Sequence, residues 1–286
     1  QTNADRPRPP AFNQFAPRVL RSSGYDSSGP VGEAIGDRLD GWAAWRQGDC
    51  QLTVAVEELW QQYPKEIVLG PVTAIKLFTR DEVEPGELDI DWRVGIREED
   101  ISPTGAPWRR WGDDGVAKTH RVRVSLHHTD RAVLHEEKAR AFQAPLLPGV
   151  SPERYAETGV LGTLAPARPQ AFPRSEQFLQ GLTEWLWRHQ REWSNWYGMV
   201  NWGGIQTHYL PLEGHWTNLV ERFGWLNGET EPQLGVLLQY VRTGDTRWLR
   251  MGTGMVKHLV DVDAVHLGER AGYMRRHFAV HFGQPG

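Results

Sequence analysis

The stretch "PQLGVLLQYVRTGDTRWLRMGTGMVKHLVDVDAVH" (residues 232–266) decides how the second half of this chain folds. Apolar residues recur at helical spacing on both sides of a Thr-Gly-Asp sequence at 243–245. Pro232 stands where the first residue of a helix tolerates proline, because an N–H at that position would have no partner within the helix. The stretch therefore predicts two consecutive helices joined by the Thr-Gly-Asp turn.

The helical pattern extends upstream to residue 173. The segment "SEQFLQGLTEWLWRHQREWSNW" (175–196) opens with Ser175, a residue type favoured at helix N-caps. Its apolar positions are Phe178, Leu179, Leu182, Leu186 and Trp193. Hairpins of helices repeated in this way are typical of an α/α toroid, and residues 173–286 hold about four helices. We expect the opening arc of such a ring, with the rest of the ring missing from the chain.

The pattern before residue 145 is different. Residues 1–35 are rich in Pro, Ser and Gly, and residues 40–145 form short apolar runs between turn signals. In "THRVRVSL" (119–126) every second residue is apolar, which predicts a half-buried strand with its valines and leucine on one face. Six prolines over 145–173 indicate a connector. The predicted fold class is α+β in two domains: an antiparallel β-sandwich-like domain over 1–172 and a partial α/α toroid over 173–286.

Composition excludes several classes of protein. The net charge of −4 and the pI near 6.3 leave no basic excess to neutralise a nucleic acid. No apolar run reaches the roughly 18 residues of a membrane span. The single cysteine, Cys50, excludes an internal disulfide and is expected to be an inert core residue. The 14 tryptophans and 11 histidines are unusual. Indole rings stack on sugar rings, and the alternative is that they fill a large core.

The richest candidate site is the segment 195–232, which mixes glycines, aromatic residues and polar residues. Its polar residues include Tyr197, Asn201, His208, His215 and Glu229, and its tryptophans include Trp202 and Trp216. Such a mixture suits a cleft that stacks sugar rings and hydrogen-bonds their hydroxyl groups. The alternative is a well-packed loop between helices.

Two further groups of titratable residues stand out. Lys118 and His120 share one face of a predicted strand, where they could neutralise a carboxylate and move a proton; the alternative is a solvated strand face. The C-terminal stretch holds His258, His266, His277 and His281 near Asp261, Asp263, Arg275 and Arg276. His277 and His281 have a metal-sharing spacing, but Phe278 rules out an HExxH motif. His258 and Asp261 are spaced for a pair, and "DVD" (261–263) falls short of a calcium motif.

Eight short segments give the sequence a family resemblance. They are "ELWQQYPKEI", "IKLFTR", "GVAKTHRVRV", "RYAETGVLGTLAP", "WYGMVNWGGI", "GWLNGETEP", "YVRTGD" and "HLVDVDAVH…RRHFAVHFG", and they cover most of residues 50–283. In this order and spacing they resemble the exo-rhamnogalacturonan lyase and YetA-like group. The resemblance implies a β domain followed by an α/α toroid, an acidic polysaccharide or oligosaccharide as substrate, and β-elimination as the reaction. At 201–204 the chain has Asn-Trp-Gly-Gly where that group often has an acidic residue.

The resemblance also suggests roles for the candidate residues. β-Elimination needs a cation at the uronate carboxylate, a base for the C5 proton and an acid for the leaving oxygen. The expected carboxylate ligands are Arg188, Arg276, Lys118 and the neutral donor Asn201, with Trp202, Trp216 and Glu229 as further substrate-binding residues. The expected base and acid are His208 and Tyr197, with His215 and His120 in reserve. No cofactor is expected, with calcium as the alternative, and neither nucleic acid nor membrane is an expected partner. A polysaccharide substrate implies a secreted or periplasmic location.

Two alternatives to the lyase stay open. A glycoside hydrolase would need two carboxylates roughly 5–9.5 Å apart. Glu221, Glu229 or Glu231 could face Asp261 or Asp263 in that way. The second alternative is a carbohydrate-binding protein without catalysis.

Overall fold

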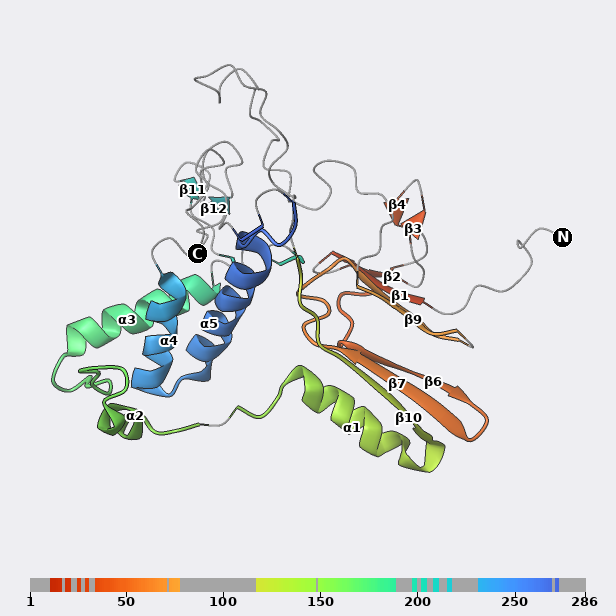
Figure 1. Ribbon diagram of the computed structural model, residues 1–286, viewed down its shortest axis with the longest axis horizontal. Coiled ribbons are helices and arrows are strands. Elements are labelled where there is room, and N and C mark those ends of the chain that lie inside the picture. The colour runs from red at the N-terminus through yellow and green to blue at the C-terminus, as the bar shows by residue number, and fades with distance from the viewer. Residues whose placement is uncertain are drawn as a thin grey trace, which may run out of the picture. The chain divides into compact units, whose positions relative to one another are not determined.

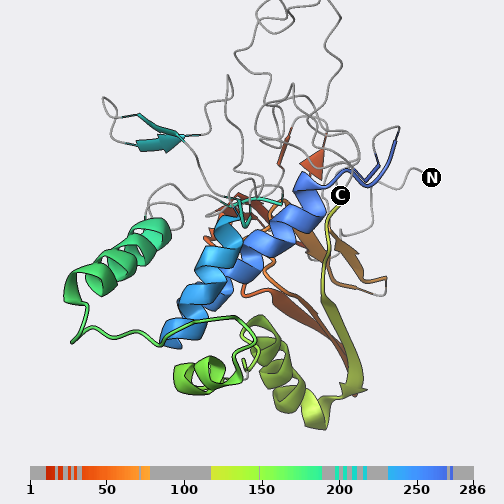
Figure 2. The ribbon, with the colours of Figure 1, turned by 60° about the vertical axis from the view of Figure 1, so that its left-hand side comes forward.

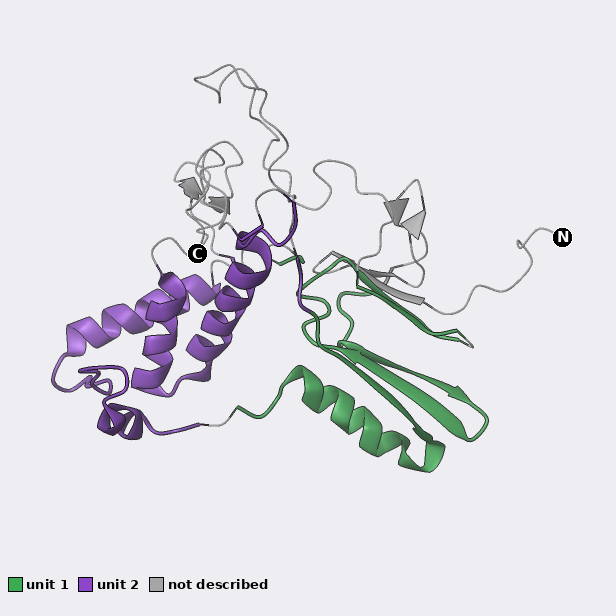
Figure 3. Cartoon of the chain, viewed as in Figure 1, with its two compact units in different colours: residues 1–83, 120–147, 197–199 green, residues 84–119, 148–196, 200–286 purple. Residues whose placement is uncertain are grey.

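A computed structural model describes the chain in segments. The described residues are 11–16, 19–21, 25–26, 29–30, 34–70, 72–77, 117–147, 149–188, 197–199, 202–204, 208–210, 215–217, 231–268 and 271–272. The chain divides into two compact units (Figure 3). Unit 1 comprises residues 1–83, 120–147 and 197–199, and unit 2 comprises residues 84–119, 148–196 and 200–286. The boundary predicted between residues 172 and 173 stays a prediction.

Unit 1 is built on two antiparallel sheets (Figure 1). The larger sheet has the strand order β5-β2-β1-β8-β9, formed by Ala34–Gly36, Val19–Arg21, Ala11–Ala16, Lys65–Val68 and Ala74–Lys76. The smaller sheet has the order β10-β7-β6, formed by Val122–His128, Cys50–Val56 and Trp42–Gln47. A short ladder joins β3 (Tyr25–Asp26) to β4 (Gly29–Pro30). The predicted antiparallel β structure is thus present as small sheets, and the sandwich-like arrangement over 1–172 stays a prediction.

The core of unit 1 follows from alternation along β7. Val54 lies opposite Ala43 of β6 and Val124 of β10, so residues of this register share one face of the smaller sheet. On that face Val54 and Val56 are almost fully buried and pack in one cluster with Ile67 of β8. Cys50, expected in the core, is exposed because it lies at the end of β7 beside the turn at 48–49.

The strand predicted from "THRVRVSL" is β10, but its less exposed face is not the apolar one. Val124 and Leu126 are 62% and 75% exposed. The opposite face is the more covered one, because helix α1 (Ala132–Gln143) packs against β10 and β7. A 3₁₀ turn at Thr129–Arg131 connects β10 to this helix. The sequence predicted only β structure before residue 145, so α1 corrects that expectation.

Unit 2 contains four helices among the described residues (Figure 2). They are α2 (Pro152–Thr158), α3 (Pro173–Leu186), α4 (Pro232–Thr243) and α5 (Thr246–His258). Ser151 caps α2 by accepting a hydrogen bond from the Arg154 N–H. Helix α3 begins at Pro173, so Ser175 lies inside its first turn. The prediction that Ser175 caps this helix is therefore wrong. Helix α4 begins at Pro232, as the sequence predicts.

Helices α4 and α5 form an antiparallel hairpin around an apolar cluster of Val236, Tyr240, Trp248, Met251 and Met255. Its Thr-Gly-Asp turn is closed by two side chains. The Thr243 hydroxyl donates to the Gln239 carbonyl and accepts from the Asp245 N–H, and Asp245 caps α5 by accepting from the Arg247 N–H. The two helices predicted from 232–266 are confirmed.

A short β-hairpin also lies in unit 2, where the sequence predicted a loop. Its strands are β11 (His208–Leu210) and β12 (His215–Thr217), with His208 opposite Thr217 and Leu210 opposite His215. None of the helices in the described segments is long and apolar enough to cross a membrane.

Candidate functional site

The strongest cluster of chemistry-bearing side chains lies at the C-terminal end of α5, in unit 2. His258, Asp261 and Asp263 are 2%, 4% and 1% exposed. Lys118 comes from a segment 140 residues before His258 in the sequence. Its side chain is 6% exposed and lies beside Asp261. Charged side chains are almost never buried this completely unless they are paired. We call the buried side chains of His258, Asp261, Asp263 and Lys118, together with the exposed Thr119 that binds Asp261, the buried polar cluster.

The backbone at the end of α5 shapes this cluster. After His258 the helix widens into a π-helical turn over Leu259–Asp263, and the Ala264 N–H closes it on the Leu259 carbonyl at 3.1 Å. Such turns are rare and occur frequently at functional sites. Val262, between the two aspartates, is fully buried and anchors the turn. The wider turn therefore fixes two carboxylates inside the protein.

Asp261 holds the segment 117–119 in place. One carboxylate oxygen accepts from the Thr119 N–H and the other from the Thr119 hydroxyl, both at 2.8 Å. The Ala117 N–H donates to the Asp261 carbonyl at 3.1 Å. The Lys118 Nζ lies 3.9 Å from the Asp261 Oδ2, an ion-pair distance. Hydrogen bonds to a charged acceptor are stronger than neutral ones, so this carboxylate is a firm anchor for the segment.

Asp263, rather than Asp261, is the carboxylate beside His258. The His258 Nε2 lies 3.3 Å from the Asp263 Oδ1. The spacing of three in the sequence suggested the pair His258–Asp261, and the π-helical turn is the reason for the difference. An α-helix brings residues three or four apart together, whereas the wider turn brings residue 263 to residue 258.

A glycine brings a third distant segment against the cluster. Gly203 has a φ of +97°, and a Cβ there would lie 2.0 Å from the Gly254 carbonyl oxygen and 3.0 Å from the His258 Cβ. Only glycine allows this backbone to lie so close to α5. Trp202, next in the chain, is half-buried. Three segments that resemble the lyase group, around residues 118, 203 and 258, therefore meet at one place.

The other predicted site residues fall into three sets. Arg188 is exposed just after α3, His120 is half-buried in unit 1, and Tyr197 is buried in unit 1. For His208, His215 and Trp216 the structure gives the strand register alone. Asn201, Glu229 and Arg276 lie outside the described residues, as do Glu221, His277 and His281. The structure brings Lys118 and Trp202 into one unit. The catalytic and substrate-binding roles of all the predicted site residues stay predictions.

Tyr197 is held by packing within unit 1. Its ring meets the Trp60 ring edge-on at 4.7 Å between centroids, and the Arg38 guanidinium lies 3.7 Å from the Trp60 centroid. The neighbouring backbone is fixed as well, because Gly198 and Met199 donate N–H hydrogen bonds to the Gln61 and Tyr63 carbonyls at 2.8 Å. The segment 197–199 is thus bound to the loop after β7.

Sequence reasoning missed two features of the cluster. Thr119 was not among the candidate residues, yet its N–H and its hydroxyl both donate hydrogen bonds to the Asp261 carboxylate. Gly203 was noted only as part of a glycine-containing segment. Neither a lone threonine nor a glycine pair carries a sequence signal for a contact with a helix far along the chain. No group of three or more His, Cys, Asp or Glu side chains suited to a metal occurs in the described part of the chain.

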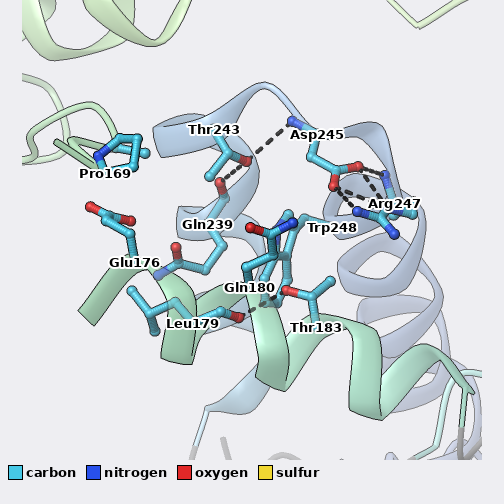
Figure 4. A pocket seen from close by; sticks show the side chains of 11 residues that line it. Pro169, Glu176, Leu179, Gln180, Thr183, Gln239, Thr243, Asp245, Arg247 and Trp248 are labelled. Carbon is cyan, nitrogen blue, oxygen red and sulfur yellow. Dashed lines mark hydrogen bonds and ion pairs between the residues drawn. The ribbon is translucent and has the colours of Figure 1, made fainter. Parts of the chain in front are cut away.

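A separate pocket of about 220 Å³ lies on unit 2 between α3 and the turn joining α4 to α5 (Figure 4). It is lined by Ala167, Pro169, Glu176, Leu179, Gln180, Thr183, Gln239, Thr243, Asp245, Arg247 and Trp248. Arg242 ties its walls together: it pairs with Glu176 at 2.5 Å and donates to the Gln239 side chain at 2.8 Å. Arg247 donates hydrogen bonds to Asp245, which lower the pKa of that carboxyl group. The hydrogen bonds to Asp245 and Glu184 raise the pKa of the Arg247 guanidinium.

Comparison with known proteins agrees with the helical architecture of unit 2. Residues 145–286 match the family model of the "PcRGLX-like protein C-terminal alpha/alpha toroid domain". Over 173 residues the chain is 28% identical to "Uncharacterized protein YetA" of Bacillus subtilis (strain 168). This alignment covers 59% of the chain but only 20% of that relative, so the chain corresponds to about a fifth of its length. The toroid expected for the C-terminal part and the similarity to YetA are therefore both found.

Proposed function

We propose that this chain is part of a polysaccharide lyase that cleaves an acidic, uronate-containing polysaccharide by β-elimination. The observation that carries the proposal is the match of residues 145–286 to the toroid domain of the PcRGLX-like proteins. The buried polar cluster lies in the same unit and joins three segments through which the chain resembles the lyase group. A rhamnogalacturonan is the substrate that this resemblance favours.

In the proposed reaction, cations bind the uronate carboxylate, so that the C5 proton becomes acidic enough for a base to remove. Arg188 is suited to the carboxylate, because its side chain is exposed at the end of α3 and a guanidinium binds a carboxylate bidentately. His208 and Tyr197 are the proposed base and acid, with His215 and His120 as alternates, and Arg276, Asn201, Trp202, Trp216 and Glu229 as further ligands.

Lys118 takes a different part in this proposal. Its ammonium group is buried beside Asp261, so we assign it a positioning role: it helps to hold the segment 117–119 against α5. Because this ammonium group is buried and neutralises Asp261, we do not assign it to the binding of the substrate carboxylate. The buried polar cluster then acts as the support of the active site, and the acid–base groups lie elsewhere.

The burial of the two aspartates favours a lyase over a hydrolase. A glycoside hydrolase places two carboxylates on either side of the scissile bond, with room for a sugar and a water. Asp261 and Asp263 are 4% and 1% exposed and face Thr119, Lys118 and His258. A hydrolase would have to use other acids. A carbohydrate-binding protein without catalysis is the remaining alternative.

Ultraviolet absorbance tests the proposal, because β-elimination creates a double bond conjugated to the uronate carboxylate. The substrates are rhamnogalacturonan, ulvan, alginate, gum arabic and glycosaminoglycans. The chromophore should grow with one of them and be lost in His208→Ala, while His266→Ala, which changes an exposed histidine, should keep the activity. If new reducing ends form without the chromophore, the protein is a hydrolase and the lyase proposal is wrong. If the polysaccharide binds but neither the chromophore nor new reducing ends form, the protein is a carbohydrate-binding protein without catalysis.

A further inference from the structure

The pocket between α3 and the α4–α5 turn lies apart from the buried polar cluster, and the proposed chemistry does not use it. Arg242 connects its walls. That side chain pairs with Glu176 of α3, and its Nε donates to the Ala165 carbonyl at 3.2 Å. The Ala167 N–H donates back to the Arg242 carbonyl at 2.9 Å. Three separate parts of unit 2 are thereby joined around the pocket.

The polar groups of this pocket are partly used and partly open. The Gln180 amide makes no hydrogen bond to any residue in the described segments. Glu176 uses its Oε1 for Arg242 and the Arg168 N–H, and Gln239 uses its Oε1 for Arg242. The Glu176 Oε2 and the Gln239 amide nitrogen thus retain hydrogen-bonding capacity toward the pocket. Figure 4 shows Glu176 and Gln180 of α3 and Gln239 of α4 among the residues that line the pocket.

The charged groups of the pocket are paired with one another. Two acids, Glu176 and Asp245, and one arginine, Arg247, belong to its lining. Arg247 is occupied by a bidentate contact with Asp245 and by a contact with Glu184, and Arg242 is occupied by Glu176. Among the described residues, the pocket therefore offers no unpaired cation to a carboxylate. Open amide and carboxylate groups beside the apolar atoms of Leu179 and Trp248 match a ring that carries hydroxyl groups and no charge.

From this lining we infer that the pocket binds one neutral sugar residue. Its volume of about 220 Å³ is smaller than the roughly 300–1,000 Å³ of pockets for drug-sized ligands, so it suits a single ring. The inference rests on the proposed function for the choice of a carbohydrate. It goes beyond that function by assigning a second site, distinct from the uronate-cleaving one, which would grip an uncharged residue of the same polymer.

Saturation-transfer NMR with methyl glycosides tests the inference on the whole chain. The probes are methyl α-glucoside, methyl β-galactoside and methyl α-rhamnoside, with methyl α-glucuronide as the charged counterpart of the glucoside. None of the neutral glycosides has a carboxylate, so none can be a substrate for β-elimination. We expect at least one of them to bind, and the glucuronide to bind more weakly than the glucoside.

Two variants and a control locate the binding. Gln180→Ala should weaken it about five- to tenfold, the loss expected for one hydrogen-bonding side chain. Ala167→Phe should abolish the binding by filling the pocket. Gln177→Ala changes an exposed residue that lies on α3, as Gln180 does, but outside the pocket, and it should leave the binding unchanged. Absence of binding by every neutral glycoside, or binding that survives Gln180→Ala and Ala167→Phe, would overturn the inference. A chromophore in the lyase assay would then leave the proposed function standing.

Discussion

Replacing Asp261 by alanine should destabilise unit 2 far more than replacing any exposed aspartate. The change removes the acceptor of two 2.8 Å hydrogen bonds from Thr119 and the carboxylate 3.9 Å from the Lys118 ammonium. Each hydrogen bond to a charged group is worth about 1.5–3 kcal/mol. Removing one partner of a buried ion pair costs about 3–5 kcal/mol. These contributions overlap, so we expect the free energy of unfolding to fall by about 3–5 kcal/mol in total.

Asp245→Ala is the matched control. Asp245 lies at the other end of the same helix and also accepts from a backbone N–H and binds an arginine, but its side chain is 29% exposed. Loss of a helix N-cap together with a solvent-screened ion pair costs about 1–2 kcal/mol. Burial is thus the main difference between the two aspartates. Asp261→Asn gives a finer comparison, since an NH2 group, which cannot accept a hydrogen bond, replaces one of the two carboxylate oxygens that bind Thr119.

Urea unfolding followed by circular dichroism measures the stability, and amide hydrogen exchange at Thr119 measures the contact itself. In Asp261→Ala the protection of the Thr119 N–H should be lost, whereas Asp245→Ala should retain it. If Asp261→Ala loses no more stability than Asp245→Ala and keeps Thr119 protected, then Asp261 does not anchor the segment 117–119. The positioning role of Lys118 would be refuted with it.

Three further predictions concern His135 and two glycines. Burial and the neighbouring His127 lower the pKa of His135 below its usual 6.5, so its stabilising effect is present above pH 6.5 and is lost as the pH falls through the folded pKa. The urea midpoint of His135→Gln should therefore change less between pH 7.5 and 5 than that of the native chain. Gly203→Ala should destabilise by about 2–4 kcal/mol, because its Cβ would clash with the Gly254 carbonyl. Gly235→Ala, in open space on α4, should stabilise by about 0.5–1 kcal/mol in the same unfolding assay.

Regular helices with an apolar stripe were predictable from the sequence. Helices α4 and α5 have such stripes, and the structure places both where the pattern does. Helix α1 was missed because its only buried residues are Ala132 and Ala139, so no run of large apolar residues marks its inner face. The start of α3 was misplaced because proline is tolerated in a first helical turn, and the chain uses Pro173 there rather than the preferred cap Ser175.

The candidate site was predictable in its residue types but not in its contacts. The sequence singled out Lys118, His258, Asp261 and Asp263, and all four are buried in the cluster. Spacing assigned the wrong carboxylate to His258, because a π-helical turn shifts the neighbour along the chain by one or two positions. The contact between Thr119 and Asp261 joins residues 142 positions apart, which no local pattern specifies.

The burial of this cluster bears on how the proposed active site would work. His258 and Asp263 are 2% and 1% exposed and lie beside each other, so this pair belongs to the interior of the protein. A buried ion pair adds little stability compared with apolar packing, but it demands one geometry of the segments that carry its members. Here those segments are 117–119 and the end of α5, with the backbone at Gly203 lying against the same helix. The chain on either side of Gly203 includes Tyr197 and His208, the proposed acid and base. The contact of Gly203 with α5 therefore fixes one point of the segment that carries these proposed residues, which is the contribution we assign to the buried polar cluster.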